Sequence, residues 1–567
     1  MPPNPVPTNP VPQNRSVAYR HPAALRRAAT QPVRYAVLVA GALPVLAFPA
    51  PNLELLAWVG LVPGLLLMLA APTRREAAVR GWWFGTGYLL AALYWLVPNL
   101  GPGLLLVAIL LGFLWSGVGV AAWATLRPPV SWKGAVAALA IVPSAWLVTE
   151  WLRSWQGFGG PWAVLGVSQW QHPAVLALAA VGGVWLVTFA LVAANTGVLI
   201  AMVARGLAPR LIGCAGVLAA VAAGPAAFAL TAPSPAPRQV TIALVQPGLH
   251  RAPAPRVAAS ERLTAGPARN GDLIVWGESS VGYDLARNSR LRTRLQALSA
   301  SVGAQILASQ DAQDGAGAKS KVAVLIGANG IDGQYVKTRL VPFGEYIPFR
   351  SELGWLSAIS RAAPQNMATG TGAQVLQATV RGGRGLSIGV LICFESAFPD
   401  MSRYDAEHGA QVIIYQTSDS TFQGSWALEQ HASLGALRAA ETGRPVVQAA
   451  LTGDSAAFDA RGRVLAWAGP ADRGAVLASI RLPPASARTP FDRLGDYVPL
   501  TALAIVVLAA AFGLLRGLPG RGVRPPPARE HGQTRIVWTD GRAPDKSASV
   551  PGVPDGQPGH EAAAGET

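Results

Sequence analysis

Long apolar runs fill most of the first 231 residues and recur once after residue 490. Each run approaches the roughly 20 residues that an α-helix needs to cross the hydrocarbon core of a bilayer. The pattern predicts a membrane domain of seven spans over residues 33–231 and an eighth span at 491–516. The eight apolar runs lie near residues 35–50, 54–71, 82–98, 103–125, 135–152, 173–203, 211–231 and 497–515.

Residues 232–490 have a different pattern. Short β-branched runs alternate there with segments rich in Gly, Pro and charge, and the stretches 289–302 and 427–442 have a helical pattern. Strands that alternate with helices indicate an α/β domain. The predicted strands lie within residues 239–246, 272–278, 303–310, 321–328, 386–393, 410–419 and 445–453. The predicted fold class is therefore a multi-pass α-helical membrane domain joined to an α/β domain.

Both ends of the chain have the composition of disordered segments. Residues 1–32 are rich in Pro and basic, and they show no signal-peptide cleavage pattern. The tail from 517 to 567 is rich in Pro, Gly and charge. We expect a disordered basic arm before the membrane domain and a disordered cytoplasmic tail after it.

Composition supports a membrane protein. Hydrophobic residues make up 51% of the chain and charged residues only 13%, about half the usual globular share. The mean hydropathy is +0.32. The net charge of +16 raises the possibility of nucleic-acid binding. However, the basic residues gather in the tails and short loops without interleaved aromatic residues, so we expect no nucleic-acid partner.

The distribution of basic residues predicts the orientation of the spans. Lys and Arg occur in the short loops 71–81, 127–134 and 204–210, and are absent from the intervening loops 49–52 and 98–103. Basic loops stay on the cytoplasmic side of a membrane. The sequence therefore predicts a plasma-membrane protein with both termini in the cytoplasm and the α/β domain on the extracytoplasmic side.

Cysteine and histidine usage gives no indication of a disulfide framework or a metal site. The only cysteines are Cys214 and Cys393. Cys214 lies inside an apolar run, where a small buried hydrophobic side chain is its simplest interpretation. The seven histidines show no metal-ligand spacing. We expect no metal.

Cys393 stands where the predicted strand "LSIGVLI" ends and the chain must turn before Pro399. A side chain at such a turn is presented at the sheet edge, as in nucleophile elbows. A thiol is a weak nucleophile until it loses its proton, so it needs a base and a nearby cation. Cys393 is thus a candidate nucleophile, and a buried structural cysteine is the alternative.

Two other residues supply the base and the cation. Glu278 ends the predicted strand "DLIVW" and can accept the proton of the thiol. Lys337, in "GQYVKTRLVPFGEYIP", is one of only three lysines in residues 232–490 and can stabilise a thiolate and then an oxyanion. Taken singly, Glu278 is better explained as a carboxylate near a helix N-terminus, and Lys337 is a weak signal that a solvated loop lysine also explains.

Taken together, these three residues carry a family resemblance. Glu278, Lys337 and Cys393, in this order and each beside a strand, resemble the Glu–Lys–Cys triad of the nitrilase, or carbon–nitrogen hydrolase, superfamily. The segments "KTRLVPFGEYIPFR" and "GVLICFES" resemble its membrane branch, the apolipoprotein N-acyltransferases. The similarity extends over about residues 35–515. It implies a nitrilase-like α-β-β-α sandwich for the extracytoplasmic domain.

The resemblance also implies a reaction. Glu278 would take the proton of Cys393, and the thiolate would attack an acyl ester of a membrane phospholipid while Lys337 stabilises the oxyanion. The resulting thioester would pass its acyl chain to the α-amino group of the N-terminal diacylglyceryl-cysteine of an apolipoprotein. The products would be a lysophospholipid and a triacylated lipoprotein. We expect a monomer that uses no cofactor.

Further residues match supporting positions of the family. The resemblance implies that Glu345 orients Lys337 or assists the oxyanion, and that Glu395 supports the nucleophile turn. Three positions depart from the family pattern: Phe394 stands where Tyr is common, Ser418 where Asn is common and Thr421 where Trp is common. These departures bear on acyl-chain and headgroup preference.

Glu150, Arg153 and the segment 157–162 match the family's outer loop between the fifth and sixth spans. The resemblance implies that Glu150, Arg153 and Trp162 shape a loop through which lipid gains access. Trp155 and Trp162 are equally well interpreted as anchors at the membrane interface.

Two alternatives to the acyltransferase remain open. One is a membrane-tethered amidase of the same superfamily, which would need a closed polar pocket for a small amide. The other is a degenerate, binding-only domain, which a missing triad residue would favour. Neither requires eight spans around the catalytic domain.

Overall fold

The computed structural model describes residues 22–231, 237–313, 317–359, 363–422 and 424–517. The chain divides into two units, Met1–Leu514 and Leu515–Thr567, and nearly all of the described residues belong to the first. Most of the predicted disordered arm and tail lies outside the described residues. Helix α1 begins at Pro22, earlier than the boundary at residue 33 that the sequence predicts.

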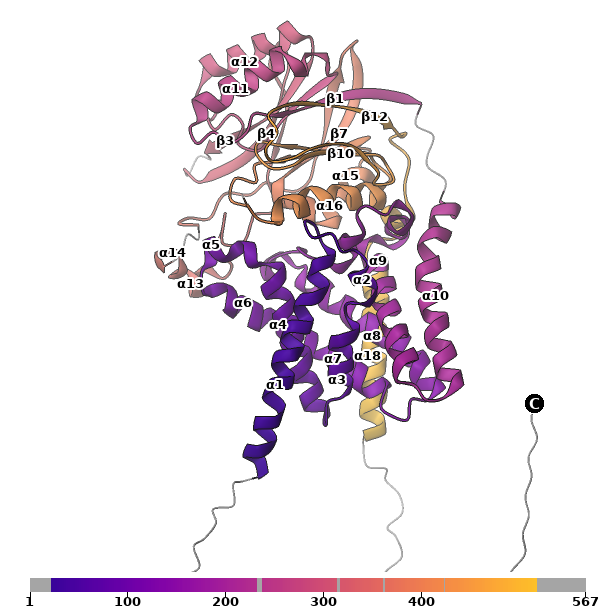
Figure 1. The fold of residues 1–567 in the computed structure, drawn as a ribbon. Coiled ribbons are helices and arrows are strands. Elements are labelled where there is room, and N and C mark those ends of the chain that lie inside the picture. Colours follow the sequence, from indigo (N-terminus) through magenta and orange to yellow (C-terminus); the bar gives the residue numbers. More distant parts are fainter. Residues whose placement is uncertain (1–21, 232–236, 314–316, 360–362, 423, 518–567) are drawn as a thin grey trace, which may run out of the picture. The chain divides into compact units, whose positions relative to one another are not determined.

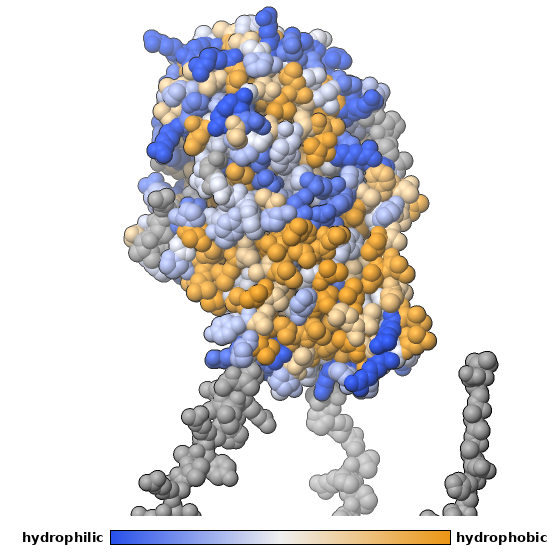
Figure 2. All heavy atoms as spheres, in the orientation of Figure 1, coloured by the Kyte–Doolittle hydropathy of each residue, from blue (hydrophilic) through white to orange (hydrophobic). Residues whose placement is uncertain are grey.

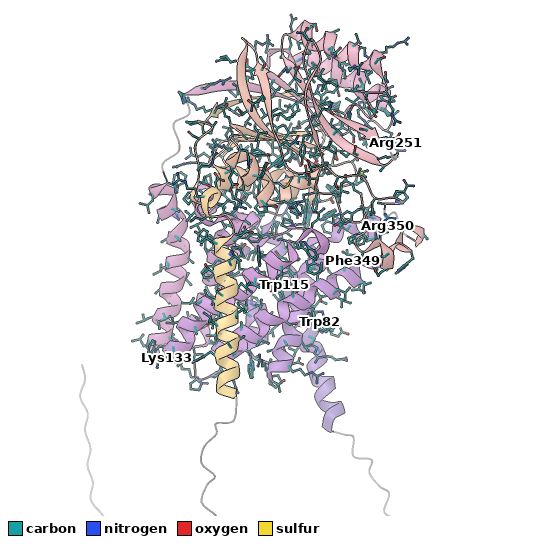
Figure 3. All side chains as sticks on the ribbon, turned by 180° about the vertical axis from the view of Figure 1, so that it is seen from behind. Trp82, Trp115, Lys133, Arg251, Phe349 and Arg350 are labelled. Atoms are coloured by element: carbon teal, nitrogen blue, oxygen red, sulfur yellow. The ribbon has the colours of Figure 1, made fainter. Side chains whose placement is uncertain are left out.

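Helices alone make up the first part of the described chain, and Figure 2 shows hydrophobic residues gathered over this region. Trp115 lies inside it and is fully buried (Figure 3). Short 3₁₀ turns connect several of its helices. The helices are α1 (Pro22–Ala42), α2 (Leu56–Val59), α3 (Val62–Leu69), α4 (Arg74–Ala92), α5 (Val97–Leu100), α6 (Gly103–Gly112), α7 (Ser116–Thr125), α8 (Trp132–Arg153), α9 (Pro173–Val203) and α10 (Leu207–Leu230).

Four helical segments of the described chain are long and apolar enough to cross a membrane. They are Gly103–Thr125, Trp132–Arg153, Pro173–Val203 and Leu207–Leu230, and each coincides with a predicted span. Three shorter apolar helices, Gln31–Ala47, Leu56–Leu69 and Tyr497–Gly513, coincide with three further predicted spans.

The remaining predicted span, 82–98, does not form a single helix. Helix α4 begins before it, at Arg74, and ends at Ala92, and its first turns carry Arg74, Arg75, Glu76 and Arg80. The rest of the run lies in a 3₁₀ turn, Tyr94–Leu96, and at the start of α5. The predicted basic loop 71–81 therefore includes the first turns of a helix. The count of eight spans stays a prediction.

The second part of the described chain forms two six-stranded sheets. One has the strand order β12-β1-β2-β3-β4-β5 and the other β11-β10-β9-β8-β7-β6. The strands are β1 (Arg238–Gln246), β2 (Leu273–Trp276), β3 (Gln305–Gln313), β4 (Lys319–Ile326), β5 (Ile331–Val336), β6 (Val375–Val380), β7 (Arg384–Ile392), β8 (Val412–Thr417), β9 (Val446–Ala450), β10 (Ser455–Phe458), β11 (Val464–Ala468) and β12 (Gly474–Leu482).

The two sheets pack face to face between helices, as Figure 1 shows. Side chains alternate across a strand, so Ile242 and Leu244 of β1 join the core that includes β7 and β8, while Ala243 and Val245 join the core under α11 and α12. Helices α15 (Pro399–Glu407) and α16 (Ala427–Thr442) cover the other sheet, and α16 also packs on α9. The predicted nitrilase-like α-β-β-α sandwich is confirmed.

Most of the sandwich followed from its sequence pattern. The seven predicted strand segments coincide with β1–β4 and β7–β9, and the two predicted helical stretches coincide with α12 (Ser289–Val302) and α16. Strands β5, β6 and β10–β12 and helices α11 (Pro253–Ala265) and α15 were not predicted. Strand β5 reads "IDGQYV" and is only partly buried, so its pattern lacks the apolar run that identifies the central strands.

The two sheets are joined where β2 and β8 end. The buried Gln416 side chain donates hydrogen bonds from Nε2 to the carbonyl oxygens of Trp276 (2.8 Å) and Leu307 (3.1 Å). Gly277 lies so close that a Cβ atom there would be 2.3 Å from the Leu451 nitrogen and 2.7 Å from the Thr417 oxygen. This close approach sets the position of the residue that follows, Glu278.

We predict that Gly277→Ala destabilises the sandwich, because its Cβ meets backbone atoms that cannot move independently. Overpacking of this kind costs about 1–3 kcal/mol. Thermal unfolding in detergent measures the effect as a lower midpoint. Gly330→Ala is the matched control, since nothing lies within 4 Å of its added Cβ. Equal midpoints for the two variants would contradict the prediction.

Candidate active site

Cys393 occupies a strained turn at the end of β7. It is the first residue of the 3₁₀ turn η7 (Cys393–Ala397), is 7% exposed, and has a φ of +54°. A positive φ is uncommon for a residue with a side chain, and such strain persists only where surrounding contacts enforce it. The sharp turn predicted after the strand "LSIGVLI" is therefore present, and the thiol sits at its apex.

Lys337 is fully buried directly after β5, between two carboxylates. Its Nζ lies 2.8 Å from Glu345 Oε1 and 3.2 Å from Glu278 Oε1. Burial alone would lower the pKa of Lys337, but Glu278 and Glu345 raise it well above its ordinary value. The lysine therefore stays an ammonium ion, in contact with both carboxylates.

In the absence of substrate, the pKa of Cys393 is not lowered as that of an activated thiol would be. Burial, reinforced by the Glu278 carboxylate, raises the pKa of Cys393 well above its ordinary value, against the opposing effect of Lys337. The thiol therefore holds its proton until a base accepts it. Glu278 and Glu345 both face the same cavity and both contact the buried ammonium, so each is placed where a base could stand.

The cavity at this site has a volume of about 340 Å³. Glu278, Glu345 and Cys393 line it together with the segment Ser418–Phe422, while Lys337 lies buried behind the two carboxylates. All of its lining residues come from the sandwich. Two of the three predicted catalytic residues thus line one cavity, and the third, Lys337, contacts one of them, Glu278, at 3.2 Å.

Glu395 ties the nucleophile turn to the loop that carries Lys337. Its Oε1 accepts hydrogen bonds from the Thr338 and Arg339 N–H groups (2.7 and 2.9 Å) and from the Tyr335 hydroxyl (2.7 Å). Its Oε2 accepts from the Ile392 N–H (2.7 Å). Burial raises the pKa of Glu395 even though the N–H groups of Ile392 and Arg339 oppose that rise.

Glu345 and Phe394 also lie at this site. Glu345 binds Lys337 through Oε1 and accepts the Val341 N–H through Oε2 at 2.8 Å, which fixes its carboxylate toward the lysine. Phe394 is buried and meets Phe398 edge to face, with ring centroids 5.2 Å apart. Both rings pack against Gly160 of the helical region, where a Cβ would lie 2.8 Å from either ring.

Two of the three residues assigned to the lipid-access loop are buried inside the helical region. Glu150 accepts the Leu165 N–H at 2.9 Å and the Thr188 hydroxyl at 3.2 Å. The guanidinium of Arg153 lies 3.5 Å from the carbonyl oxygens of Gly160 and Ala163. Neither side chain faces the exterior, so their effect on the loop is to fix its backbone.

The interpretation of Trp162 as an interfacial anchor is wrong. Trp162 is only 4% exposed, and its Nε1 donates to Gln430 Oε1 at 3.2 Å. Its ring packs against Trp95 and Phe422, with centroids 5.0 and 6.2 Å away. Trp155, by contrast, is 59% exposed, as an anchor would be.

Two of the three residues that depart from the family pattern, Ser418 and Thr421, line the cavity, whereas Phe394 does not. Ser418 and Thr421 belong to the wall segment Ser418–Phe422, and the Ser418 hydroxyl bonds the Ser420 hydroxyl at 3.2 Å. Phe422 at the end of this wall meets Trp95 of the helical region, with ring centroids 4.7 Å apart.

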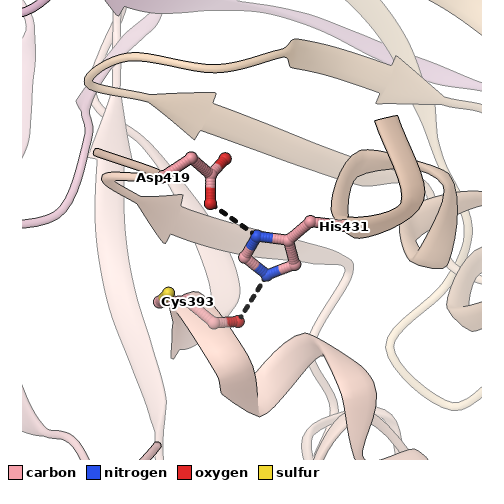
Figure 4. A group of neighbouring side chains, drawn as sticks. All are labelled: Cys393, Asp419 and His431. Atoms are coloured by element: carbon pink, nitrogen blue, oxygen red, sulfur yellow. Dashed lines mark hydrogen bonds and ion pairs between the residues drawn. The ribbon is translucent and has the colours of Figure 1, made fainter. Parts of the chain in front are cut away.

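Sequence reasoning missed His431 and Asp419, which lie beside the nucleophile in Figure 4. His431 Nδ1 lies 2.7 Å from Asp419 Oδ1, and Nε2 lies 3.1 Å from the Cys393 carbonyl oxygen. Potential ligand atoms of these three residues lie within 4.8 Å of one another. Both ring nitrogens are engaged in hydrogen bonds, so the arrangement does not favour a metal ion. The available signal was that Asp419 follows β8 as Glu278 follows β2.

Comparisons with known proteins agree with this geometry. Residues 40–197 match the family model of the apolipoprotein N-acyltransferase N-terminal domain, and residues 241–487 match the carbon–nitrogen hydrolase model. An apolipoprotein N-acyltransferase of Allorhizobium ampelinum is 32% identical over 69% of this chain and 77% of its own length. One from Geobacter metallireducens is 28% identical over 84% and 95%.

Among solved structures, an amidase from Nesterenkonia sp. matches 44% of this chain and 93% of its own. The sequence identity is 18% and the TM-score is 0.32.

We predict that Glu395→Gln destabilises the sandwich more than Tyr335→Phe does. The glutamine NH₂ group cannot accept the Ile392 N–H, which leaves a buried donor unpaired at about 1–3 kcal/mol. Tyr335→Phe removes a single hydroxyl, worth about 0.5–1.5 kcal/mol. Thermal unfolding in detergent compares the two. A larger loss in Tyr335→Phe would mean that Glu395 does not hold the turn.

Proposed function

This chain belongs to the apolipoprotein N-acyltransferase family, and from that premise we propose that Cys393, Glu278 and Lys337 carry out its acyl transfer. The protein is a membrane enzyme with apolipoprotein N-acyltransferase activity, which implies a phospholipid acyl donor and a lipoprotein acceptor. The assignment of the catalytic residues is supported by one observation above all. Glu278 and Cys393 line the same cavity, and the Lys337 ammonium contacts Glu278 at 3.2 Å.

The first half of the reaction forms a thioester. Glu278 accepts the proton of Cys393, and the sulfur attacks the ester carbonyl carbon of the phospholipid. The carbon–oxygen bond then breaks, and the alkoxide of the lysophospholipid leaves with the proton that Glu278 held. The acyl chain remains on Cys393, and no cofactor takes part.

The second half transfers the acyl chain to nitrogen. The α-amino group of the acceptor's diacylglyceryl-cysteine attacks the thioester carbonyl, Glu278 accepts a proton from the amine, and the carbon–sulfur bond breaks. The sulfur leaves as a thiolate and recovers the proton from Glu278. The product is an amide, and the enzyme returns to its starting state as expected for a ping-pong enzyme.

Lys337 and Glu345 have complementary roles in this scheme. Lys337 supplies the fixed positive charge that a tetrahedral oxyanion needs in a low-dielectric site. Glu345 keeps the ammonium in place through its 2.8 Å contact, so that Lys337 keeps a partner when Glu278 becomes protonated. One carboxylate is therefore free to act as a base while the other holds the lysine.

We place the acyl chain along the cavity wall that ends at Phe422. This ring contacts Trp95 and Trp162 of the helical region, so it is the part of the lining nearest to the membrane segments. Glu150 and Arg153 fix the backbone of the adjoining loop, and Trp155 is exposed on it. Lipid would reach the thiol by displacement of this aromatic contact.

One observation favours a second candidate function. The cavity of about 340 Å³ lies at the lower end of the range for small-ligand sites and is lined only by the sandwich. A membrane-tethered amidase acting on a small amide would need just such a site. The two functions differ in whether a phospholipid acylates Cys393.

We propose eight spans, a monomer, and an extracytoplasmic position for the sandwich. Lys133 supports this orientation, because it belongs to a basic loop and lies at the end of the helical region remote from the sandwich in Figure 3. Basic loops remain cytoplasmic. The lipoprotein and phospholipid substrates would then meet the site at the outer leaflet.

The acyltransferase scheme predicts a thioester on Cys393. Purified protein incubated with a phospholipid carrying a fluorescent acyl chain should acquire a label that neutral hydroxylamine removes. Cys393→Ser should acquire no hydroxylamine-sensitive label, whereas Cys214→Ala, which removes the other cysteine, should label normally. Absence of label in the unmodified protein, with turnover of a small amide, would favour the amidase.

The orientation predicts which introduced cysteines are accessible from outside. In a Cys214→Ala, Cys393→Ala background, a membrane-impermeant maleimide added to spheroplasts should label Arg251→Cys but not Lys133→Cys. Both positions are exposed, one on the sandwich and one on the basic loop. Permeabilised spheroplasts should label at both positions. The reverse pattern would invert the proposed topology.

A further inference from the structure

A buried charged pair, distinct from the lysine cluster, lies beside the backbone of the nucleophile. His431 Nδ1 is 2.7 Å from Asp419 Oδ1, and Nε2 is 3.1 Å from the Cys393 carbonyl oxygen (Figure 4). A carboxylate oxygen and a carbonyl oxygen can only accept hydrogen bonds. Both ring nitrogens must therefore carry hydrogens for the two bonds to exist, which makes His431 an imidazolium ion.

The surroundings of His431 are consistent with this charge. The side chain is 1% exposed, and the titratable groups that face it are Asp419 after β8, Cys393 in η7 and, farther away, Glu278 after β2. Burial acts to lower the pKa of His431, but Asp419 and the bond to the Cys393 carbonyl raise it above its ordinary value. Thr417 completes the cluster, with its hydroxyl 2.7 Å from Asp419 Oδ1.

The bond to the Cys393 carbonyl acts on the strained part of the turn. Cys393 has a φ of +54°, a conformation that relaxes unless contacts hold the flanking peptides. Because the carbonyl and N–H groups of a trans peptide point in opposite directions, the His431 bond also fixes the direction of the Phe394 N–H. The thiol and the next peptide are thus oriented by a single imidazolium.

The charge of His431 also bears on the proton transfer. When Glu278 accepts the thiol proton, one negative charge moves from the side of Lys337 to the sulfur. The sulfur lies within 4.8 Å of the ligand atoms of His431 and Asp419. The His431 imidazolium attracts the negative charge on the sulfur, as the Lys337 ammonium attracted it on Glu278. It also offsets the repulsion between the thiolate and the nearby Asp419 carboxylate.

We propose that His431 is a positioning residue for Cys393: held as an imidazolium by Asp419, it clamps the Cys393–Phe394 peptide and favours the thiolate. The proposal rests on the proposed function only in taking Cys393 as the nucleophile. It assigns a role to a histidine that contacts two residues of the cavity lining, Cys393 and Asp419, but does not itself belong to the Glu–Lys–Cys triad.

The test measures thiolate reactivity without any lipid. In a Cys214→Ala background, Cys393 is the only cysteine, so its alkylation by iodoacetamide can be followed by intact-protein mass spectrometry between pH 6 and pH 9. The thiolate displaces iodide and forms one carbon–sulfur bond. His431→Gln should lower the second-order rate at pH 7 at least tenfold and move the rise in rate to higher pH.

Thr417→Val is the matched control for a merely structural effect. It removes the hydroxyl that bonds Asp419 in the same buried cluster, keeps a similar side-chain volume, and leaves both bonds of the imidazolium in place. Its alkylation rate should stay within about twofold of the background. Equal losses in Thr417→Val and His431→Gln, or an unchanged profile in His431→Gln, would overturn the proposal.

Asp419→Asn adds a pH signature. The amide no longer holds the cation, so burial lowers the pKa of His431, and the ring loses its charge as the pH rises through that pKa. The positive charge is then present at low pH and lost at high pH, although the neutral ring can still donate from Nε2 to the Cys393 carbonyl, while thiol ionisation increases with pH. The alkylation profile should therefore flatten in Asp419→Asn, whereas the background rises throughout; a profile parallel to the background would contradict the charged state.

The result is separable from the fate of the proposed function. If His431→Gln shifts the alkylation profile but phospholipid never acylates Cys393, the positioning role stands and the acyltransferase scheme fails. If phospholipid acylates Cys393 equally well in the background and in His431→Gln, and alkylation is also unchanged, the scheme stands and the positioning role fails.

Discussion

The burial of one lysine between two carboxylates is the constraint on which the site depends. An ammonium without solvent is tolerated only when anions and hydrogen bonds replace its hydration, so Lys337 requires both Glu278 and Glu345. Lys337 and Glu278 follow strands of one sheet, β5 and β2, whereas Cys393 follows β7 of the other. The thiol can therefore reach the cluster only if the sheets are held together at their ends. The Gln416 side chain and the absence of a side chain at Gly277 meet that requirement.

The nucleophile turn is stabilised from two sides by different kinds of interaction. On one side, the Glu395 carboxylate gathers N–H donors from before Cys393 and from the loop after β5. On the other side, the His431 imidazolium donates to the carbonyl of Cys393 itself. Together they hold the peptide that precedes Ile392 and the peptide that follows Cys393, the residue whose φ is positive. The strain of the turn is thereby offset by contacts that do not involve substrate.

The sequence predicted those site residues in which a reactive side chain stands at the end of an apolar strand. Cys393 and Glu278 each end an apolar strand, and their order with Lys337 carries a family resemblance, so the central strands and the cluster could be predicted together. The edge strand β5 was not predicted, because its residues are mostly polar and partly exposed. His431 escaped because its partners, Asp419 and a backbone carbonyl, come together only through the packing of α16 on η7. The burial of Trp162 was missed for the same reason, since Phe422 and Gln430 lie far from it along the chain.

The contact between the helical region and the nucleophile turn determines whether the sandwich can be separated from the rest of the chain. Phe394 and Phe398 pack against Gly160, and Phe422 packs against Trp95 and Trp162, so residues of the helical region help to bury the aromatic surface beside the thiol. A sandwich excised from the chain would expose these rings to water next to its most reactive atom. In this chain the helical region therefore shields the rings beside Cys393 in addition to anchoring the sandwich. Neither part could be replaced by an unrelated one without leaving these rings uncovered.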